Sequence, residues 1–384
     1  MSLSLFGTVS DNTVALDRKT ATPLIINGDM AIAQRGTSAT ALGNGDTGYH
    51  TVDRFQFRED GSPTYEFTMS QSTDTPTGQG FSKSLKLDCT TADTSLASAD
   101  ALSIRHTIEA QNLQLLDYGI SSAKTLTLTY WVKTNKTGTY TLWVYSEDGS
   151  RNISKTYTVS SANTWEKKVI NIDADTGGTI NNDNGIGLIL GWYLGAGTDF
   201  TSGTLNTSWN SLVTANRVSS SNVNLSDSTD NEWYITGVQL EVGTFDANSI
   251  ADFQFEDVGT SLARCQRYFQ KSFPQGTTPQ NYSSYVAGQS DNSIGATMSS
   301  TEFKTVITLK CEMRSAPTIT YYRAQNTPED GEWTFFDGGD KLNPSSMASN
   351  SQTHRFTAVL TYSSGLTAGN SGLCQGNYKA DAEL

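Results

Sequence analysis

Short stretches of alternating hydrophobic and polar residues recur along the first two-thirds of the chain. In PTYEFTMSQ, Tyr65, Phe67 and Met69 take every second position, and comparable runs bounded by Gly, Asn, Asp and Ser continue to about Gly243. A period of two places successive side chains on opposite faces of a β-strand. About ten such runs joined by turn residues predict a β-sandwich of the jelly-roll kind over residues 23–246.

The alternating pattern is interrupted over residues 247–272 and resumes in the last part of the chain. Residues 247–272 hold an acidic linker followed by LARCQRYFQKS, in which apolar residues recur at helical spacing. Strand-like runs such as EFKTVITLKCEM and HRFTAVLTYS resume within residues 273–384. We therefore expect an all-β protein: a jelly-roll β-sandwich, a linker with a short amphipathic helix over residues 262–272, and a smaller C-terminal β domain.

The expected helix is unusual in a chain of this kind, because a helix so short is marginal in water and must pack on something. Two partners remain open: the helix packs within its own chain, or it meets the same helix in neighbouring copies of the protein. In the second case the oligomer seam would be formed by Leu262, Arg264, Cys265, Arg267, Tyr268 and Phe269.

Composition narrows the range of partners. The net charge is −13 and only 17% of the 384 residues are charged. Binding to nucleic acid needs clustered Lys and Arg, so the composition argues against it and against anionic membranes. The four cysteines form no CxxC pair and no Cys/His cluster, so we expect buried free thiols rather than a zinc site or a disulfide framework.

Catalytic motifs are not evident. The three histidines are isolated, and the sequence contains no GxSxG and no phosphate-binding glycine loop. Acidic pairs such as Asp173 and Asp175 occur in a turn-like stretch, where such pairs are common, although two carboxylates across a cleft are what a glycosidase needs. We expect a protein that is not an enzyme.

Three stretches resemble bacteriophage tail-fibre and virion-surface proteins. They are INGDMAIAQRGTS (26–38) with YHTVDRFQF (49–57), EWYITGVQLEVGTF (232–245), and LARCQRYFQKS (262–272) with VITLKCEMRSAPTITYY (306–322). The resemblance implies a carbohydrate-binding-module-like jelly roll followed by a small C-terminal β domain. It also implies a homotrimeric tail fibre or spike that contacts a host glycan or another surface receptor during adsorption.

The resemblance leaves other virion roles open. No heptad repeat is present, so a long fibre shaft is missing from this sequence. A capsid decoration protein, such as a head fibre or cement protein, is therefore an alternative, and a polysaccharide depolymerase is a weaker one.

Sugar binding needs exposed aromatic rings with polar neighbours. Tryptophans within the strand-like runs, such as Trp131, Trp143 and Trp192, are expected in the core, because aromatic residues dominate core burial. Trp209 lies in the polar stretch LNTSWNSL and is expected to be exposed. The stretch YYRAQNTPEDGEWTFFDGGD suggests a recognition loop or an inter-subunit contact formed by Tyr321, Tyr322, Trp333, Phe335 and Phe336.

A structural calcium ion is a further implication of the resemblance. Jelly-roll carbohydrate modules often hold calcium between their first and last strands, and the residues in those positions here are Asn27, Asp29 and Glu241. Calcium requires several oxygen ligands, of which these residues supply part. The alternative is ordinary capping of strand ends by Asn and Asp, so possible structural calcium is the one cofactor expectation.

The first residues suggest where the protein works. MSLSLFGTVSDN has no basic region followed by a long apolar run, so we expect no secretory signal peptide, and no apolar run reaches the length of a membrane span. The expected location is the virion, on tail or capsid, after synthesis in the host cytoplasm. Residues 1–22 have little to bury and are expected to dock onto other virion proteins.

Overall fold

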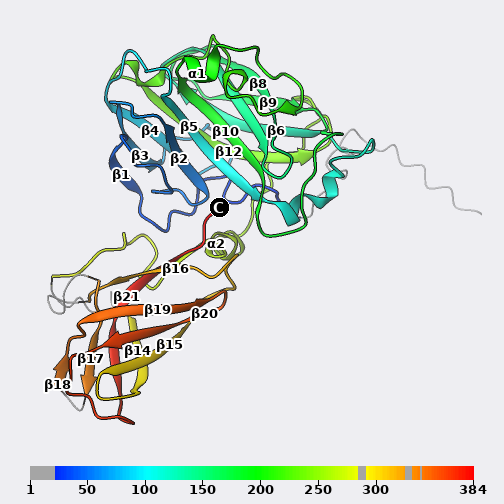
Figure 1. Cartoon of the computed structure of the whole chain (residues 1–384). Helices are drawn as coiled ribbons and strands as arrows, with labels where there is room; N and C mark the ends of the chain where they lie inside the picture. The colour runs from blue at the N-terminus through cyan, green and yellow to red at the C-terminus, as the bar shows by residue number, and fades with distance from the viewer. Residues whose placement is uncertain (1–21, 284–290, 325–330, 338–339) are drawn as a thin grey trace, which may run out of the picture. The chain divides into compact units, whose positions relative to one another are not determined.

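The computed structural model describes residues 22–283, 291–324, 331–337 and 340–384 (Figure 1). The predicted all-β class is confirmed: strands form three sheets, and the helices are few and short. The chain forms two compact units. We call residues 22–31, 40–48 and 55–256 the sandwich unit, and residues 32–39, 49–54 and 257–384 the C-terminal unit.

Two six-stranded sheets make up the sandwich unit. The first has the order β1-β3-β4-β12-β6-β9 and the second β11-β8-β7-β10-β5-β2. The strands of the first sheet are β1 (Ser38–Leu42), β3 (Glu66–Ser72), β4 (Ser84–Thr91), β12 (Glu232–Val242), β6 (Leu126–Thr134) and β9 (Glu166–Ile172). Those of the second are β11 (Asn210–Ser211), β8 (Arg151–Val159), β7 (Gly138–Ser146), β10 (Ile186–Ala196), β5 (Ala101–Glu109) and β2 (Phe55–Asp60).

Alternation along the strands builds the core between the two sheets. Tyr130 of β6 and Trp192 of β10 are both fully buried, and their rings meet edge to face at 5.7 Å. Phe57 of β2 and Phe67 of β3 also meet from the two sheets, with tilted rings whose centroids are 6.4 Å apart. The prediction of a core position is thus confirmed for Trp192, and also for Trp143, which is 2% exposed.

Short helical turns connect strands of the sandwich unit. They are η2 (Ala110–Leu116), α1 (Thr198–Thr201), η3 (Thr214–Asn216) and η4 (Leu225–Asp227). No helix among the described residues is both long and apolar enough to cross a membrane.

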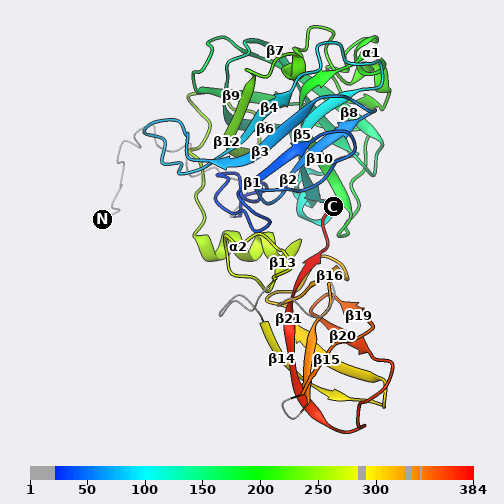
Figure 2. The same cartoon turned by 90° about the vertical axis from the view of Figure 1, so that its left-hand side faces the viewer.

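A third sheet forms the C-terminal unit around one long strand. Strand β21 (Ser371–Asp381), red in Figure 2, pairs with β14 and β17 in its first half and with β16 and β13 in its second. The other elements are α2 (Val258–Gln266), β13 (Phe269–Lys271), β14 (Asp291–Thr297), β15 (Glu302–Thr308), β16 (Thr318–Tyr322), β17 (Thr334–Asp337), β18 (Asp340–Leu342), β19 (Ser346–Gln352) and β20 (Arg355–Thr361).

The predicted helix over residues 262–272 is wrong in its bounds. Helix α2 begins four residues earlier, because the Asp257 side chain caps it by accepting a hydrogen bond from the Thr260 N–H at 3.0 Å. It ends at Gln266, since Phe269–Lys271 pair with β21 as strand β13. The sequence Leu262 to Lys271 therefore contains parts of two elements rather than one amphipathic helix.

Domain limits from the sequence differ from the observed division. The expected domains are residues 23–246 and 273–384, with a linker between them. The observed C-terminal unit instead consists of residues 257–384 together with two segments from early in the chain, 32–39 and 49–54. The segment 1–22 expected to dock onto the virion lies, except for residue 22, outside the described residues.

All four cysteines are free thiols. Cys89, Cys265 and Cys374 are buried as predicted, but Cys311 is only half-buried.

Candidate functional site

A hollow of about 420 Å³ lies on the sandwich unit, against the outer face of the first sheet. Four aromatic residues line it: Phe81, Trp131, Phe253 and Phe255. Its polar lining residues are Gln79, Thr129, Lys167 and Asp252. Its volume falls in the range of about 300–1,000 Å³ that is typical of small-molecule sites.

Strand β6 provides the floor of the hollow. Tyr130 and Val132 are fully buried between the sheets, so Thr129 and Trp131, one position before each of them, face outward. Trp131 is half-buried, which differs from the core position expected for it. The sequence shows the alternation of side chains along this strand, but it does not show which of the two sets of side chains faces the core.

Gly237 of β12 makes room for the aromatic rings. Its φ is +63°, in the left-handed region, and it sits where the register between β12 and β6 shifts. A Cβ at this position would lie 2.6 Å from Phe81 Cζ and 3.1 Å from Trp131 Cδ1. Only glycine adopts this backbone conformation without strain and leaves that space open.

A buried glutamine fixes the far wall. Gln239 of β12 is 5% exposed, and its Nε2 donates to the carbonyl of Ala251 at 3.1 Å. Its Oε1 accepts from the Gln254 N–H at 2.8 Å. One side chain therefore holds the segment that carries Asp252, Phe253 and Phe255 against the sheet.

Three phenylalanines form a compact cluster in that wall. Their ring centroids are 5.0 Å apart for Phe81 and Phe253, 5.2 Å for Phe81 and Phe255, and 4.8 Å for Phe253 and Phe255. Phe81 is almost buried, whereas Phe255 is 50% exposed. Edge contacts of this kind fix the rings, so Phe255 presents a positioned apolar surface to solvent.

The hollow combines features suited to binding an amphipathic ligand. Aromatic rings offer apolar surface, and the Gln79 amide, the Lys167 ammonium and the Asp252 carboxylate offer both donors and acceptors at the rim. A sugar presents apolar C–H faces and hydroxyl groups that both donate and accept. The chemistry of the lining fits such a ligand.

Trp209, expected to be exposed, is buried at 8%. Its Nε1 donates to the Asp173 carbonyl at 2.6 Å, and its ring meets the Tyr118 ring edge to face at 5.7 Å. The expectation failed because the polar loop around Trp209 folds back onto the sandwich, where the indole finds both an acceptor and an aromatic partner.

Asp175, one of the acidic pair considered for catalysis, has a structural environment. It is fully buried, and its carboxylate accepts from Arg151 Nε at 2.9 Å and from the Gly178 N–H at 3.1 Å. These contacts close a turn, which agrees with the reading of this stretch as an acid-rich turn.

The aromatic residues expected at a C-terminal recognition loop are mostly in the core. Tyr321, Trp333 and Phe335 are 9%, 2% and 0% exposed and belong to one buried cluster. Trp333 Nε1 donates to the Asn377 carbonyl at 2.8 Å, which explains why a tryptophan is tolerated there. Tyr322 and Phe336 are half-buried, and residues 325–330 of the expected loop lie outside the described residues.

Half of the seam residues expected around α2 are buried inside the C-terminal unit. Cys265, Tyr268 and Phe269 are each 1% exposed, whereas Leu262, Arg264 and Arg267 are half-buried. The rings of Tyr268 and Phe269 are covered by two arginines from the early segments. The Arg54 guanidinium lies 3.5 Å from the centre of the Tyr268 ring, and that of Arg35 lies 3.7 Å from the Phe269 ring.

Carboxylates pair with both arginines. Arg35 contacts Asp381 at 3.2 Å and Glu383 at 3.1 Å, and Arg54 also pairs with Glu383. Asp53 lies 3.9 Å from Arg35. We call these five residues the buried ionic cluster. The cluster covers Tyr268 and Phe269 with residues of the same chain. This agrees with the first of the two alternatives, in which the stretch 262–272 packs within its own chain.

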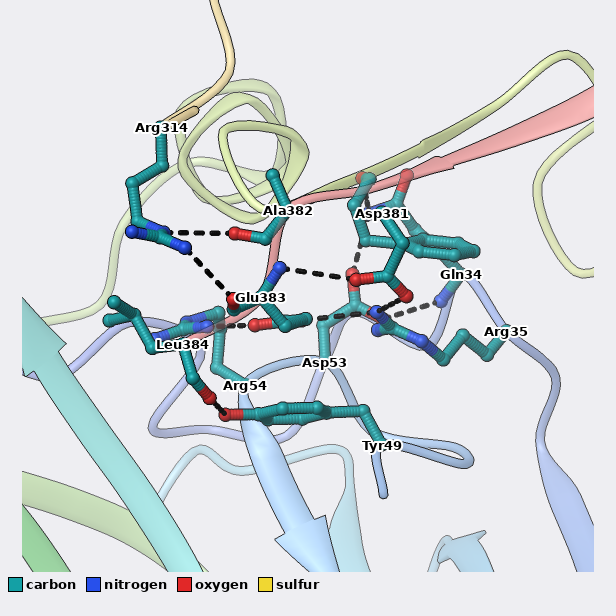
Figure 3. A network of polar contacts seen from close by, with 11 residues as sticks. Gln34, Arg35, Tyr49, Asp53, Arg54, Arg314, Asp381, Ala382, Glu383 and Leu384 are labelled. Carbon is teal, nitrogen blue, oxygen red and sulfur yellow. Dashed lines mark hydrogen bonds and ion pairs between the residues drawn. The ribbon is translucent and has the colours of Figure 1, made fainter. Parts of the chain in front are cut away.

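Gln34 and Arg314 complete the surroundings of the buried ionic cluster. Gln34 donates through its backbone N–H at 2.9 Å and its Nε2 at 2.6 Å to the Asp53 carboxylate, and its Nε2 also reaches the Phe269 carbonyl. Arg314 donates to the carbonyls of Ala382 and Glu383 (Figure 3). Burial raises the pKa of Asp53 to about 6, against the opposing effects of Arg35 and the Gln34 hydrogen bonds.

Lys271, which lies within the stretch 262–272 that was expected to be helical, is also enclosed. It is 0% exposed, and its Nζ donates to the Thr277 carbonyl. Burial lowers the pKa of Lys271 to about 8. Lys271 therefore faces the interior of the C-terminal unit rather than solvent.

The three expected calcium ligands lie near one another only in part. Gly28 and Asp29 lie against β12, where the Val238 N–H donates to the Gly28 carbonyl at 2.9 Å. Glu241 lies three residues beyond Val238 on β12, a separation of about 10 Å along the strand. Glu241 and Asn27 are both buried. Among the described residues, no group of three or more His, Cys, Asp or Glu could hold a metal ion. Calcium stays a prediction.

Sequence reasoning missed most of the hollow. Asp252, Phe253 and Phe255 were assigned to the linker, and Phe81, Gly237 and Gln239 drew no attention. A signal was present in DFQFED, where two phenylalanines alternate within an otherwise acidic connection. Apolar residues in a supposed linker indicate that it packs on something.

No protein-family model and no curated protein sequence matches the chain. Among solved structures, a tailspike protein 4 enzymatically active domain of bacteriophage CBA120 is 14% identical with a TM-score of 0.28, covering 49% of this chain. The chain spans about a fifth (19%) of that domain's length.

Two carbohydrate-binding modules are similar at the same level. The family 11 module of a Clostridium thermocellum cellulosomal cellulase is 9% identical with a TM-score of 0.26, covering 54% of this chain and 96% of the module. A xylan-binding domain of family 22 is 14% identical with a TM-score of 0.27, covering 55% and 98%. All three TM-scores lie below 0.5, so these likenesses carry no argument about what this chain binds.

Proposed function

We propose that this protein is a non-enzymatic structural protein of a bacteriophage virion, a tail fibre or spike component that contacts a host-surface glycan. The hollow on the sandwich unit carries the glycan part of this proposal. It places a half-exposed Phe255 and a half-buried Trp131 beside an amide, an ammonium and a carboxylate, within a volume suited to a few sugar units. The virion part rests on the resemblance of residues 26–38, 49–57, 232–245, 262–272 and 306–322.

Titration of the full chain with host-surface polysaccharide fragments tests the glycan part. Phe255→Ala and Trp131→Ala should each weaken binding at least tenfold, because each removes a ring that the sugar would cover. Tyr145→Ala is the matched control: it removes a half-buried aromatic from the outer face of the other sheet, on β7. Equal affinity in all four proteins would contradict the site. Release of new reducing ends would contradict the non-enzymatic role.

Quantitative mass spectrometry of purified particles tests the virion part. A fibre or spike should be found with tails at a few copies per particle, whereas a copy number near that of the capsomers would favour capsid decoration. A protein that lacks residues 1–22 should fold but fail to join virions. Normal incorporation of that truncated protein would contradict the docking role of this segment.

A further inference from the structure

A row of exposed apolar side chains crosses the sheet of the C-terminal unit. Strands β21, β14 and β15 are hydrogen-bonded neighbours (Figure 2). Leu373 of β21 pairs with Ile294 of β14. Val306 of β15 follows the Gly295–Thr305 pair and so lies beside Ile294. On the other side, Phe336 of β17 pairs with Leu373. We call Phe336, Leu373, Ile294 and Val306 the apolar row.

The apolar row is not part of the core of its own unit. Ile294 is 78% exposed, Val306 56% and Leu373 39%, and Phe336 is half-buried. Phe303, Phe335 and Cys374, on the same or adjacent strands, are fully buried. The strand period thus divides this sheet into an inner face with a complete core and an outer face that carries the row. Exposed apolar patches of this kind mark interaction surfaces.

Charge is sparse on the part of the outer face formed by β14, β15, β20 and β19. Among the described residues of β14, β15, β19 and β20 that share this face by alternation, the charged ones are Glu302, Lys304 and Arg355. Glu302 and Lys304 pair with each other at 2.9 Å. The remaining positions carry Ser, Thr, Asn, Gln, Ala and Val. A polyanion would require more cations than this face offers, and a glycan would require aromatic rings with polar neighbours.

An identical copy fits these properties. The whole chain carries a net charge of −13, so two copies repel each other unless the surfaces that meet are poor in charge. The four neighbouring strands β14, β15, β20 and β19 extend over roughly 19 Å, and seven-residue strands are about 24 Å long, giving a face of about 460 Å². Two such faces together bury about 900 Å², which lies in the range of weak protein associations below about 1,200 Å².

We propose that the outer face of this sheet, centred on the apolar row, is the surface through which copies of this chain associate. This inference is independent of the glycan site. It moves the assembly surface away from residues 262–269, where Cys265, Tyr268 and Phe269 are already buried within the C-terminal unit. An aliphatic face on one copy then covers the same face on another, and water is released from both.

Sedimentation velocity of the full-length protein over a range of concentrations tests this proposal. The wild-type protein should sediment as an oligomer of the 41.5 kDa chain. The variant Ile294→Glu/Val306→Glu should be a monomer, because it places like charges opposite one another. The control variant Ile120→Glu/Val213→Glu changes residues that are 55% and 49% exposed in the sandwich unit, and it should associate like the wild type.

A milder variant separates association from folding. Ile294→Thr/Val306→Thr keeps β-branched residues on the strands while removing apolar surface, so circular dichroism should be unchanged and the dissociation constant should rise at least tenfold. A monomeric wild-type protein would overturn the proposal, because the outer face would then not bind a second copy of this chain. Undiminished association of both row variants would also overturn it, and would return the seam to α2 or another surface.

Discussion

Phe255 in the sandwich unit and Ile294 in the C-terminal unit are both exposed, at 50% and 78%, but their surroundings differ. Phe255 lies in a hollow beside other aromatic rings and polar groups of both charges. Ile294 lies in an aliphatic row on a sheet face with little charge. A concave aromatic and polar surface suits a small amphipathic ligand, whereas a broad aliphatic surface suits another protein surface.

The interiors of the two units differ as well. The sandwich core is dominated by aromatic and aliphatic contacts between two sheets, whereas the C-terminal unit encloses the buried ionic cluster. Burying ions is costly unless they are paired, so the C-terminal unit depends on partners from distant parts of the sequence. The sandwich unit depends more on the total apolar surface that it buries.

The largest effect is expected from breaking the buried ionic cluster. Arg54→Ala removes the ring contact with Tyr268 and one partner of Glu383, and should lower the free energy of unfolding of the C-terminal unit by about 3–5 kcal/mol. Calorimetry of the full chain should show one transition moved and the other unchanged. Arg54→Met, which keeps the packing without the charge, distinguishes the two contributions.

The matched control for Arg54→Ala is an exposed ion pair in the sandwich unit. Lys124 and Asp117 are 2.9 Å apart, with side chains 45% and 43% exposed, so Lys124→Ala should cost less than about 1 kcal/mol. Similar losses for Arg54→Ala and Lys124→Ala would contradict the difference between the two interiors.

A second effect is a pH dependence that arises from Asp53. Its pKa is raised to about 6 from 3.8, so the folded protein binds this proton more tightly than the unfolded chain does. The contribution of Asp53 to stability is therefore greatest below about pH 4 and falls as the pH rises to about 6. Over the whole titration, from well below pH 4 to well above pH 6, the stability of Asp53→Asn relative to wild type should increase by roughly 3 kcal/mol, at about 1.4 kcal/mol per pKa unit, and about two-thirds of this change falls between pH 4 and pH 6.

Chemical denaturation at a series of pH values measures this effect of Asp53. The readout is the slope of the difference with pH, because a constant offset between the two proteins reports only lost hydrogen bonds to Gln34. Parallel profiles from pH 4 to 6 would show that Asp53 titrates normally.

The smallest effect concerns the hollow. Gly237→Ala adds a methyl group at a φ of +63° and crowds Phe81 and Trp131, so it should cost about 1–3 kcal/mol and weaken glycan binding. Gly78→Ala is the control, since Gly78 also lines the hollow at a φ of +78° but has no atom within 4 Å of the added Cβ. Equal glycan affinity in the two variants would mean that the Phe81 and Trp131 rings do not contact the ligand.

The sequence predicted the fold class because alternation along strands is a local signal. It did not predict which face of a strand is covered, and Trp131 and Trp209 were therefore placed wrongly in opposite directions. Burial depends on which loops and strands fold over a residue, as Gln239 shows by holding Phe253 and Phe255 on the sheet. The buried ionic cluster could not be predicted from the sequence either, because only the complete fold brings Arg35 and Glu383 together.

The early segments of the C-terminal unit have a consequence for synthesis and for the design of fragments. Arg35 and Arg54 leave the ribosome long before Asp381 and Glu383, so they are without these two partners until nearly all of this sequence has been made. Contacts between residues so distant in sequence slow folding. The C-terminal unit also cannot complete its fold until both partners of these contacts are present. A protein truncated before Asp381, or a fragment that starts at Asp257, would lack one half of the cluster. Such products should be cleaved by proteases more readily than a chain that carries both parts of the cluster.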